Sequence, residues 1–404
     1  MDVMSPRRVI RLDGHEEAVV AADAFAASIR PGAAERDRAG AVPRAELAEF
    51  DRSGLPAITV PVADGGSGLG PRTLAEVIRI IATADPALAQ APQGHFLAVD
   101  VLGLIGTPSQ RGQILPLVVD GGRIGLTLAE RGGHHAQDLK TRLVADNSDP
   151  RLEGVKYYCT GAITSRCLAV SALDEEGRLV LAFVERDAVG VAIDEDWEAM
   201  GQRATVSGTA TFDGVRVDPA LVVPYWVAFA GPQLLGARAQ LVHAAIEVGI
   251  AEGALADAAE FVRTRSRPFF EAARLAGVTK AADDPHVLLR FGQLTTRVRA
   301  ATQLLRWAAG ELEDLGLRPV DADAAARGSI AVAQAKAFAC EVAVDVGTEL
   351  FALTGTSGTD RRHGLDRHWR NARTHSVHDP VDWKYHHVGA WALTATAPPN
   401  HGQI

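Results

Sequence analysis

The spacing of apolar residues changes twice along this chain, and each change marks a different kind of structure. Over residues 16–120 apolar positions recur at helical intervals, whereas over 123–224 short β-branched runs alternate with Gly, Asp and Asn. From residue 231 the helical interval returns in long segments. The sequence therefore predicts an α+β chain: an N-terminal helical domain (1–122), a middle antiparallel β domain (123–228) and a C-terminal four-helix bundle (229–404).

The clearest helical pattern lies in the last third of the chain. Six apolar residues step by four and three: Leu294, Val298, Ala301, Leu305, Ala308 and Leu312. This spacing places them on one face of a helix, and that face needs a partner to cover it. Further long helices are expected over residues 232–265 and 321–353, which together make a bundle.

Composition excludes several classes of function. The chain has 404 residues, with 41 Lys and Arg against 50 Asp and Glu, so its net charge is −9 and nucleic acid is not an expected partner. No window holds 18 uninterrupted apolar residues, so no membrane partner is expected. The cysteines Cys159, Cys167 and Cys340 are odd in number and form no CxxC pair, which is typical of a protein of the reducing cytoplasm.

Histidines are concentrated near the C-terminus. Six of the 13 fall in one stretch of 25 residues: His363, His368, His375, His378, His386 and His387. His375 and His378 are spaced to share one side of a helical turn, and Asp379 follows directly. Three interpretations stay open: an ordinary surface turn, a metal site of two histidines and a carboxylate, and a site that donates and accepts protons near neutral pH.

Two segments of the middle domain have the composition of a binding edge. A β-like run over residues 125–128 is followed by Ala129, Glu130 and a Gly-Gly turn, which exposes backbone N–H groups to an anion or to the edge of a heterocycle. The segment 154–162 is a strand with a tyrosine pair and then Cys-Thr-Gly. Each segment alone is equally an ordinary turn or hairpin edge. The dinucleotide fingerprint GxGxxG and the phosphate loop GxxxxGK[ST] are both absent.

Taken in order, the segments resemble the acyl-CoA dehydrogenase superfamily. LPAITVPVADGGSGLG resembles a segment of its helical domain, and GTPSQRGQILPLVVDGGRIGLTLAERGG resembles the entry into its β domain. KYYCTG stands where the superfamily has its Trp-x-Thr-Gly flavin strand, and WEAMGQRATVSGTATFDGVRVDP resembles the end of the β domain. The resemblance spans nearly the whole chain.

The C-terminal tail departs from the dehydrogenases. Many of these have a catalytic Glu that removes a proton from the thioester, and here Asp379, one methylene shorter, is followed by Pro380 at that place. Misplacing a base slows proton abstraction steeply, so dehydrogenation is not the favoured activity. A dehydrogenase with Asp379 as base is kept as an alternative. LDRHWRNARTHSVHDPVDWKYHHVG instead resembles the two-component flavin monooxygenases of the superfamily, a branch with dibenzothiophene monooxygenase-like and indole- and polyketide-hydroxylating members.

This resemblance implies a cytoplasmic, homotetrameric monooxygenase. Such enzymes receive reduced flavin from a separate NAD(P)H-dependent reductase, add O2 at flavin C4a, and pass one oxygen atom from the C4a-hydroperoxyflavin to a small aromatic or heteroaromatic substrate. FMN is favoured over FAD, because LTGTSGTDRRHG at residues 353–364 replaces the Gln-x-x-Gly-Gly-x-Gly segment that holds the ADP half of FAD. A histidine-based metalloenzyme is the third alternative.

The resemblance also implies the site residues. His375 and His378 would exchange protons with the oxygenated flavin, His95 would reach the same pocket, and Thr160 would lie beside flavin N5. Arg267 would reach the flavin phosphate of a neighbouring subunit, as the bidentate arginine fork suits a phosphate. The catalytic candidates are His378, His375, His95, Thr160 and Asp379. The flavin-binding candidates are Leu128, Ala129, Glu130, Tyr158, Cys159, Thr160, Ser207, Arg267, Arg370 and Asn371. The tryptophans that are candidates for lining a substrate cavity are Trp197, Trp369, Trp383 and Trp391.

Overall fold

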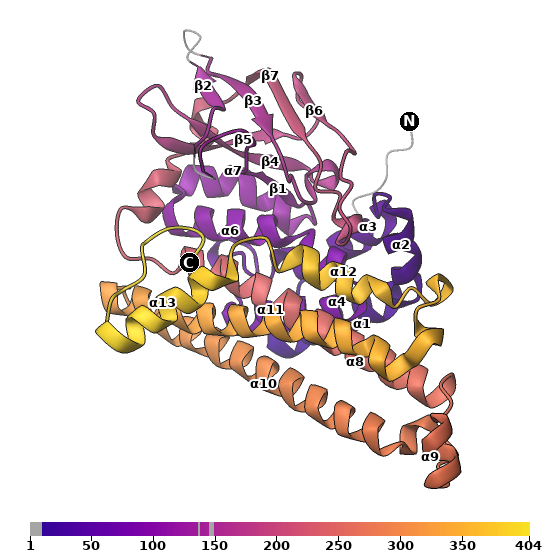
Figure 1. The fold of residues 1–404 in the computed structure, drawn as a ribbon. Helices are drawn as coiled ribbons and strands as arrows, with labels where there is room; N and C mark the ends of the chain where they lie inside the picture. Colours follow the sequence, from indigo (N-terminus) through magenta and orange to yellow (C-terminus); the bar gives the residue numbers. More distant parts are fainter. Residues whose placement is uncertain (1–9, 136–137, 145–148) are drawn as a thin grey trace.

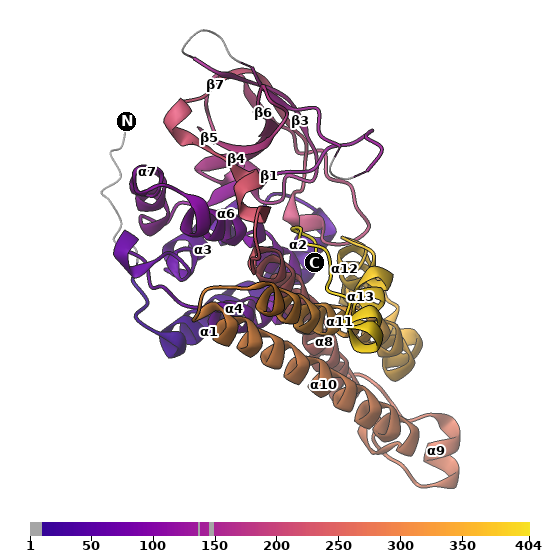
Figure 2. The same ribbon diagram turned by 90° about the vertical axis from the view of Figure 1, so that its left-hand side faces the viewer.

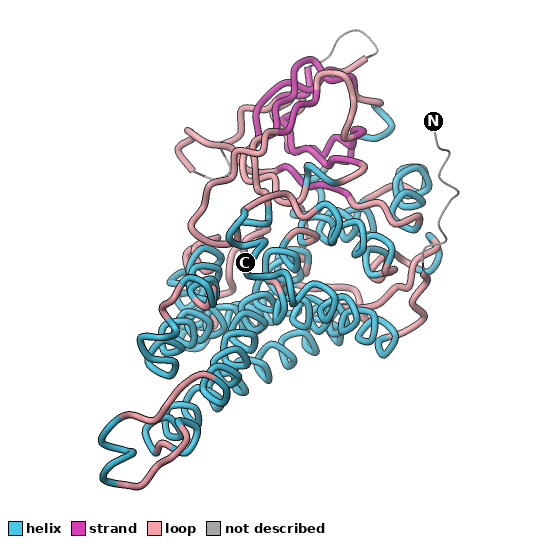
Figure 3. Tube along the Cα trace, turned by 90° about the vertical axis from the view of Figure 1, so that its right-hand side faces the viewer, coloured by secondary structure: helices cyan, strands magenta, loops and turns pink. Residues whose placement is uncertain are grey.

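The computed structural model describes residues 10–135, 138–144 and 149–404. A helical domain comes first, a β domain follows, and a helical bundle completes the chain (Figure 1). The β domain lies at one end of the molecule, and α9 lies at the other (Figure 2). The tube in Figure 3 shows strand gathered in one region and helix in the rest. The predicted α+β organisation is confirmed.

The N-terminal domain is built on an amphipathic helix, α4. Its apolar residues Leu74, Val77, Ile78 and Ile81 are all buried. The helix begins at a proline and ends before Asp85, whose side chain accepts a hydrogen bond from Ala87 N and so caps the next helix. The helices of the domain are α1 (His15–Ile29), α2 (Ala33–Ala39), α3 (Arg44–Arg52), α4 (Pro71–Ala84), α5 (Pro86–Gln90), α6 (Gln93–Ile105) and α7 (Pro108–Val119).

The β domain is one sheet with strand order β6-β7-β3-β2-β4-β5-β8, and β1 pairs with β4. Its strands are β1 (Ile124–Thr127), β2 (Arg142–Val144), β3 (Arg151–Lys156), β4 (Cys167–Leu173), β5 (Leu179–Glu185), β6 (Val191–Ile193), β7 (Ala210–Arg216) and β8 (Val222–Val223). Pairing is mainly antiparallel, as predicted, but β1 and β2 each pair with β4 in parallel. Both β4 and β5 are buried along most of their length, as sheet-core strands are.

The C-terminal domain packs the long helices α8 (Leu235–Thr264), α10 (Pro285–Gly316) and α11 (Ala322–Gly358) against one another. All six residues of the predicted stripe are buried on α10, so this helix and its buried face are confirmed. The short helix α9 (Phe270–Leu275) joins α8 to α10, and α12 (Asp366–His375) and α13 (Val381–Thr394) lie against α11.

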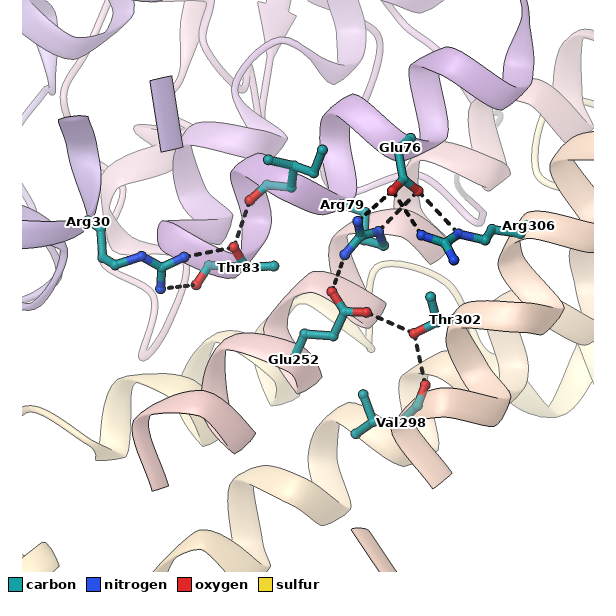
Figure 4. A network of polar contacts seen from close by, with 9 residues as sticks. Arg30, Glu76, Arg79, Thr83, Glu252, Val298, Thr302 and Arg306 are labelled. Carbon is teal, nitrogen blue, oxygen red and sulfur yellow. Dashed lines mark hydrogen bonds and ion pairs between the residues drawn. The ribbon is translucent and has the colours of Figure 1, made fainter. Parts of the chain in front are cut away.

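Charged side chains join the N-terminal domain to the bundle (Figure 4). Glu76 of α4 lies 2.6 Å from Arg79 and 3.0 Å from Arg306 of α10. Arg79 also pairs with Glu252 of α8, which accepts a hydrogen bond from Thr302 Oγ1 at 2.8 Å. Because three helices from two domains share the network, it fixes how these domains are oriented.

The three cysteines are buried, and none is bonded to another in the structure. Among the described residues, no helix has both the length and the apolar character of a membrane span.

Candidate active site

The edge of the β domain that faces the bundle presents an aromatic wall. Tyr158 is 49% exposed, and its ring meets that of Trp197 edge-on with 6.1 Å between centroids. The backbone of Tyr158 has φ of 59°, a conformation unusual for a side chain of this size, which turns the ring outward. The guanidinium of Arg131 lies 4.9 Å from the same ring.

A chain of hydroxyl groups lies next to this wall. Thr205 Oγ1 donates to Gln202 O at 2.8 Å, so its contact of 2.8 Å with Ser207 Oγ leaves Ser207 as the donor. Thr160 Oγ1 then donates to Ser207 Oγ at 2.6 Å. The lone pairs of the Thr160 oxygen are left to accept a hydrogen bond from a ligand.

Residues Leu128, Ala129 and Glu130 continue from β1 and are held in place by a buried lysine. Lys156 is fully buried, and its Nζ donates to Leu128 O at 3.3 Å and to Glu130 Oε1 at 2.6 Å. Ala129 O accepts from Tyr157 N at 2.9 Å. The carboxylate of Glu130 is thus used inside the domain, and any ligand would meet the backbone of this segment.

Cys159 differs from its neighbours, because its side chain is buried in the core of the β domain. Burial raises the pKa of its thiol to about 12. Its backbone N–H donates to Gly208 O at 3.0 Å, so Cys159 holds the strand in place and presents no reactive thiolate.

The bundle contributes a buried chain of polar groups. Nδ1 of His375 lies 2.9 Å from Oε1 of Glu247, and Nε2 of His375 lies 3.0 Å from Nδ1 of His243. All three side chains are almost fully buried. Burial, and after it the charge of Lys336, lowers the pKa of His375 to about 3, so its imidazole is neutral at physiological pH.

His378 lies at the outer end of this chain. Its ring stacks on that of His243 with 4.0 Å between centroids, and its side chain is 41% exposed. The structure therefore brings His375 and His378 together through a third histidine, which the sequence analysis did not identify.

Asp379 is buried between two lysines. It pairs with Lys336, and its Oδ2 lies 2.7 Å from Lys384 Nζ. Burial alone would raise the pKa of this carboxyl group, but His378 and the two ammonium groups hold it well below its ordinary value. A carboxylate so strongly stabilised in its ionised form is a poor base, which argues against the dehydrogenase alternative.

His95 does not join this cluster. Its Nε2 lies 2.8 Å from Pro56 O, and its Nδ1 accepts from Ile124 N at 3.1 Å. Both ring nitrogens are therefore occupied by backbone atoms, and the buried ring holds α6 against β1. Burial lowers the pKa of His95 to about 4. The expectation that His95 reaches the pocket of His375 and His378 is not supported by this placement.

Arg370 and Asn371 join α12 to the β domain. Asn371 Oδ1 accepts from Gln202 N at 2.7 Å. Arg370 donates to Met200 O at 2.8 Å and pairs with Asp37 of α2. Arg370 and Asn371 were predicted to bind flavin, and in the structure both side chains bond to other protein groups. These contacts hold α12 against the β domain, and His375 at the end of α12 lies about one helical turn after Asn371.

Arg267 lies in the exposed loop between α8 and α9, at the end of the molecule opposite the β domain (Figure 1). A groove of about 600 Å³ lies near this end, between Phe261 and Arg265 on one side and residues 356–363 on the other. Within one subunit Arg267 is remote from Thr160 and Ser207.

The sequence analysis missed His243, Glu247 and Lys336. The signal was present, because His243 and Glu247 interrupt the apolar run LVHAAIEVGIA four residues apart, the spacing of one helix face. Buried polar residues in a helix need partners, and these two find His375. No three His, Cys, Asp or Glu in the described part of the chain are grouped to hold a metal ion.

Two family models match the chain. Residues 13–122 match the acyl-CoA dehydrogenase N-terminal domain, and residues 241–383 match the acyl-CoA dehydrogenase C-terminal domain. The chain belongs to the acyl-CoA dehydrogenase family. The predicted resemblance is thereby confirmed.

Proteins that resemble this chain over most of its length include monooxygenases. Dibenzothiophene monooxygenase of Mycolicibacterium goodii is 33% identical over 379 residues, 90% of each chain. A probable FMNH2-dependent monooxygenase of Pseudomonas putida, SfnC, is 33% identical over 374 residues, 91% of this chain and 92% of the relative. The structure of TdsC from Paenibacillus sp. A11-2 with FMN and indole superposes with a TM-score of 0.89 at 32% identity, covering 96% of this chain and all of TdsC.

Proposed function

We propose that this chain is a monooxygenase that uses reduced FMN and O2 to add one oxygen atom to a small sulfur-containing or heteroaromatic molecule. The observation that carries the proposal is the surroundings of Asp379. Two lysines neutralise the carboxylate where dehydrogenases of the family place their base, and three imidazoles lie beside it. A neutral imidazole accepts through one ring nitrogen and donates through the other, and oxygen transfer needs groups that do both.

The β-domain edge suits a flavin. An isoalloxazine ring is flat and heteroaromatic, and Tyr158 with Trp197 offers it an aromatic wall. Reduced flavin has an N–H at N5, and the oxygen of Thr160 is available to accept from it because its own hydrogen is directed to Ser207. The backbone of Leu128, Ala129 and Glu130 would meet the ring edge. When bound, the reduced flavin supplies the electrons that activate O2.

The remaining parts of the proposal concern partners. Reduced FMN would come from a separate NAD(P)H-dependent reductase, since no dinucleotide fingerprint is present in the sequence. The substrate would be a molecule such as dibenzothiophene or indole, the compounds named for the relatives. A cytoplasmic homotetramer is part of the same proposal.

The test supplies FMN, NADH, a flavin reductase and ¹⁸O2 to the purified chain, with dibenzothiophene, indole and a short alkanesulfinate as substrates. Mass spectrometry is expected to find one labelled oxygen in at least one product, and none without the reductase. A parallel assay offers acyl-CoA thioesters and an artificial electron acceptor. Turnover there, with no labelled product in the first assay, would contradict the proposal.

His378 is the imidazole of the cluster closest to solvent, so its removal is expected to waste reduced FMN as hydrogen peroxide. His378→Ala should lower the fraction of FMNH2 that yields product at least tenfold, since one proton-transfer group typically contributes about 10²–10⁴ in rate. His386→Ala on α13 is the matched control, since His386 is an exposed histidine. Equal coupling in both variants would remove His378 from the reaction.

A further inference from the structure

The buried groups Glu247, His375 and His243 make two consecutive contacts that share one ring. Oε1 of Glu247 faces Nδ1 of His375, and Nε2 of the same ring faces Nδ1 of His243. A neutral imidazole carries one hydrogen, so it donates through one nitrogen and accepts through the other. The proton state of Glu247 therefore dictates the tautomer of both rings.

The two hydrogen bonds can run in either direction along the chain of three groups. The two arrangements differ by one proton. With Glu247 ionised, Nδ1–H of His375 donates to the carboxylate, Nδ1–H of His243 donates to His375, and Nε2 of His243 keeps a lone pair. With Glu247 protonated at Oε1, both donations reverse, and Nε2 of His243 carries a hydrogen. In the part of the chain that the structure describes, no hydrogen-bond partner is found for Nε2 of His243.

The surroundings of the three groups favour a proton held on Glu247 over a doubly protonated, charged imidazole ring. Glu247 is fully buried, and its second oxygen has no partner among the described atoms. Burial raises the pKa of this carboxyl group well above its ordinary value. Lys336 on α11 adds positive charge near both rings, which opposes an imidazolium. The other charged or titratable groups that face the chain are Cys340 on α11, Arg373 on α12, and His378 and Asp379 after it.

We propose that Glu247, His375 and His243 form a proton relay in which one proton taken up at Nε2 of His243 is stored on Glu247 and returned by the same path. Each N–H bond that breaks is matched by an N–H or O–H bond that forms, so no ring gains a net charge at the end of the transfer. Glu247 and His375 are positioning residues, and His243 is the terminal group. Its use in oxygen transfer rests on the proposed function, whereas the relay itself does not.

The relay is tested on the protein without flavin, by ¹⁵N NMR of the histidine rings, which distinguishes protonated from bare ring nitrogens. His243 and His375 are expected to change tautomer together in one pH transition, and neither ring should become doubly protonated within it. Signals are assigned by loss in His243→Gln and His375→Gln. Independent titration of the two rings to imidazolium would overturn the proposal.

Glu247→Gln keeps the size of the side chain and removes its titratable proton. We expect both rings to hold a single tautomer from pH 5 to pH 9 in this variant, while His386→Gln leaves the joint transition unchanged. A transition that persists in Glu247→Gln would also overturn the relay. If Glu247→Gln does not fold, the joint tautomer transition of His243 and His375 in the wild-type protein is the deciding test.

A functional readout separates the relay from the proposed function. In the coupled assay, Glu247→Gln should flatten the pH dependence of the product-to-peroxide ratio. If the joint tautomer transition is found but no substrate is oxygenated, the relay stands and the proposed function fails.

Discussion

The buried histidines of this chain differ in their hydrogen-bond partners. His95 and His375 are both buried, yet His95 bonds two backbone atoms and His375 bonds two side chains that titrate. Sequence spacing predicted His375 and His378 on one side of a turn, and in the structure both rings lie against that of His243. It gave no means of choosing partners for His95, since those contacts come from residues 39 and 29 positions away.

His95 makes the stability of the protein depend on pH. Its pKa is about 4 in the folded chain against 6.5 as the ordinary value, so between these pH values the unfolded chain binds a proton that the folded chain does not. The free energy of unfolding should therefore fall as the pH falls from 6.5 to 4, by about 3 kcal/mol from this group. His95→Gln should lose that part of the dependence in urea titrations. His386→Gln, at an exposed position, should keep it.

The ion pairs of Asp379 with two buried lysines are expected to stabilise the folded protein. Asp379→Asn leaves Lys336 and Lys384 buried without their counter-charge, which should lower the free energy of unfolding by about 3–5 kcal/mol. The exposed neighbour Asp382→Asn is the control and should stay within about 0.5 kcal/mol. Unchanged stability of Asp379→Asn in urea denaturation would show that the two ion pairs contribute little.

At the scale of elements, periodicity predicted the helices well and the sheet less well. The stripe on α10 is local, because its residues are three and four apart, and local spacing suffices to define a helix face. The parallel pairing of β1 with β4 joins residues 43 positions apart, for example Ile124 with Cys167, and alternation within one strand carries no information about its neighbour. The lysine that holds the segment after β1 was missed for the same reason.

The ion-pair network of Figure 4 should set the stability of the contact between α4, α8 and α10. The arginines Arg79 and Arg306 lower the pKa of Glu76 to about 2, although burial opposes them. Stability from this group is therefore present above pH 4.5 and is lost as the pH falls towards 2. Glu76→Gln should cost about 2 kcal/mol at pH 7, measured by urea denaturation. The control is Asp314→Asn, an exposed carboxylate that pairs with Arg72 and should change stability by less than about 1 kcal/mol.

At the scale of the whole molecule, the place of Arg267 bears on the proposed homotetramer. Since α9 and the β domain lie at opposite ends, Arg267 would act on a flavin bound by another copy of the chain. Arg267→Ala should weaken FMN binding at least tenfold, about 1.4 kcal/mol, with an unchanged melting temperature in the absence of flavin. The control is Arg274→Ala on exposed α9. Titration of flavin fluorescence measures the affinity.

Mixed oligomers give a sharper form of the same experiment. Coexpression of Arg267→Ala with Thr160→Val should restore some sites, because one chain supplies the intact Thr160 and the other the intact Arg267. Homo-oligomers of either variant should bind FMN weakly. Failure of the mixture to recover tight sites would argue that Arg267 serves no neighbouring flavin.

The position of β1 has a consequence for dissecting the molecule. This strand follows α7 directly and pairs in parallel with β4. The sheet therefore needs a segment that comes before its antiparallel strands in the sequence. A fragment beginning after β1 would leave the apolar edge of β4 unpaired, and unpaired edges template association between chains. Such a fragment should accumulate as insoluble aggregate during expression, whereas one that begins at α6 carries both the strand and the helix that covers it.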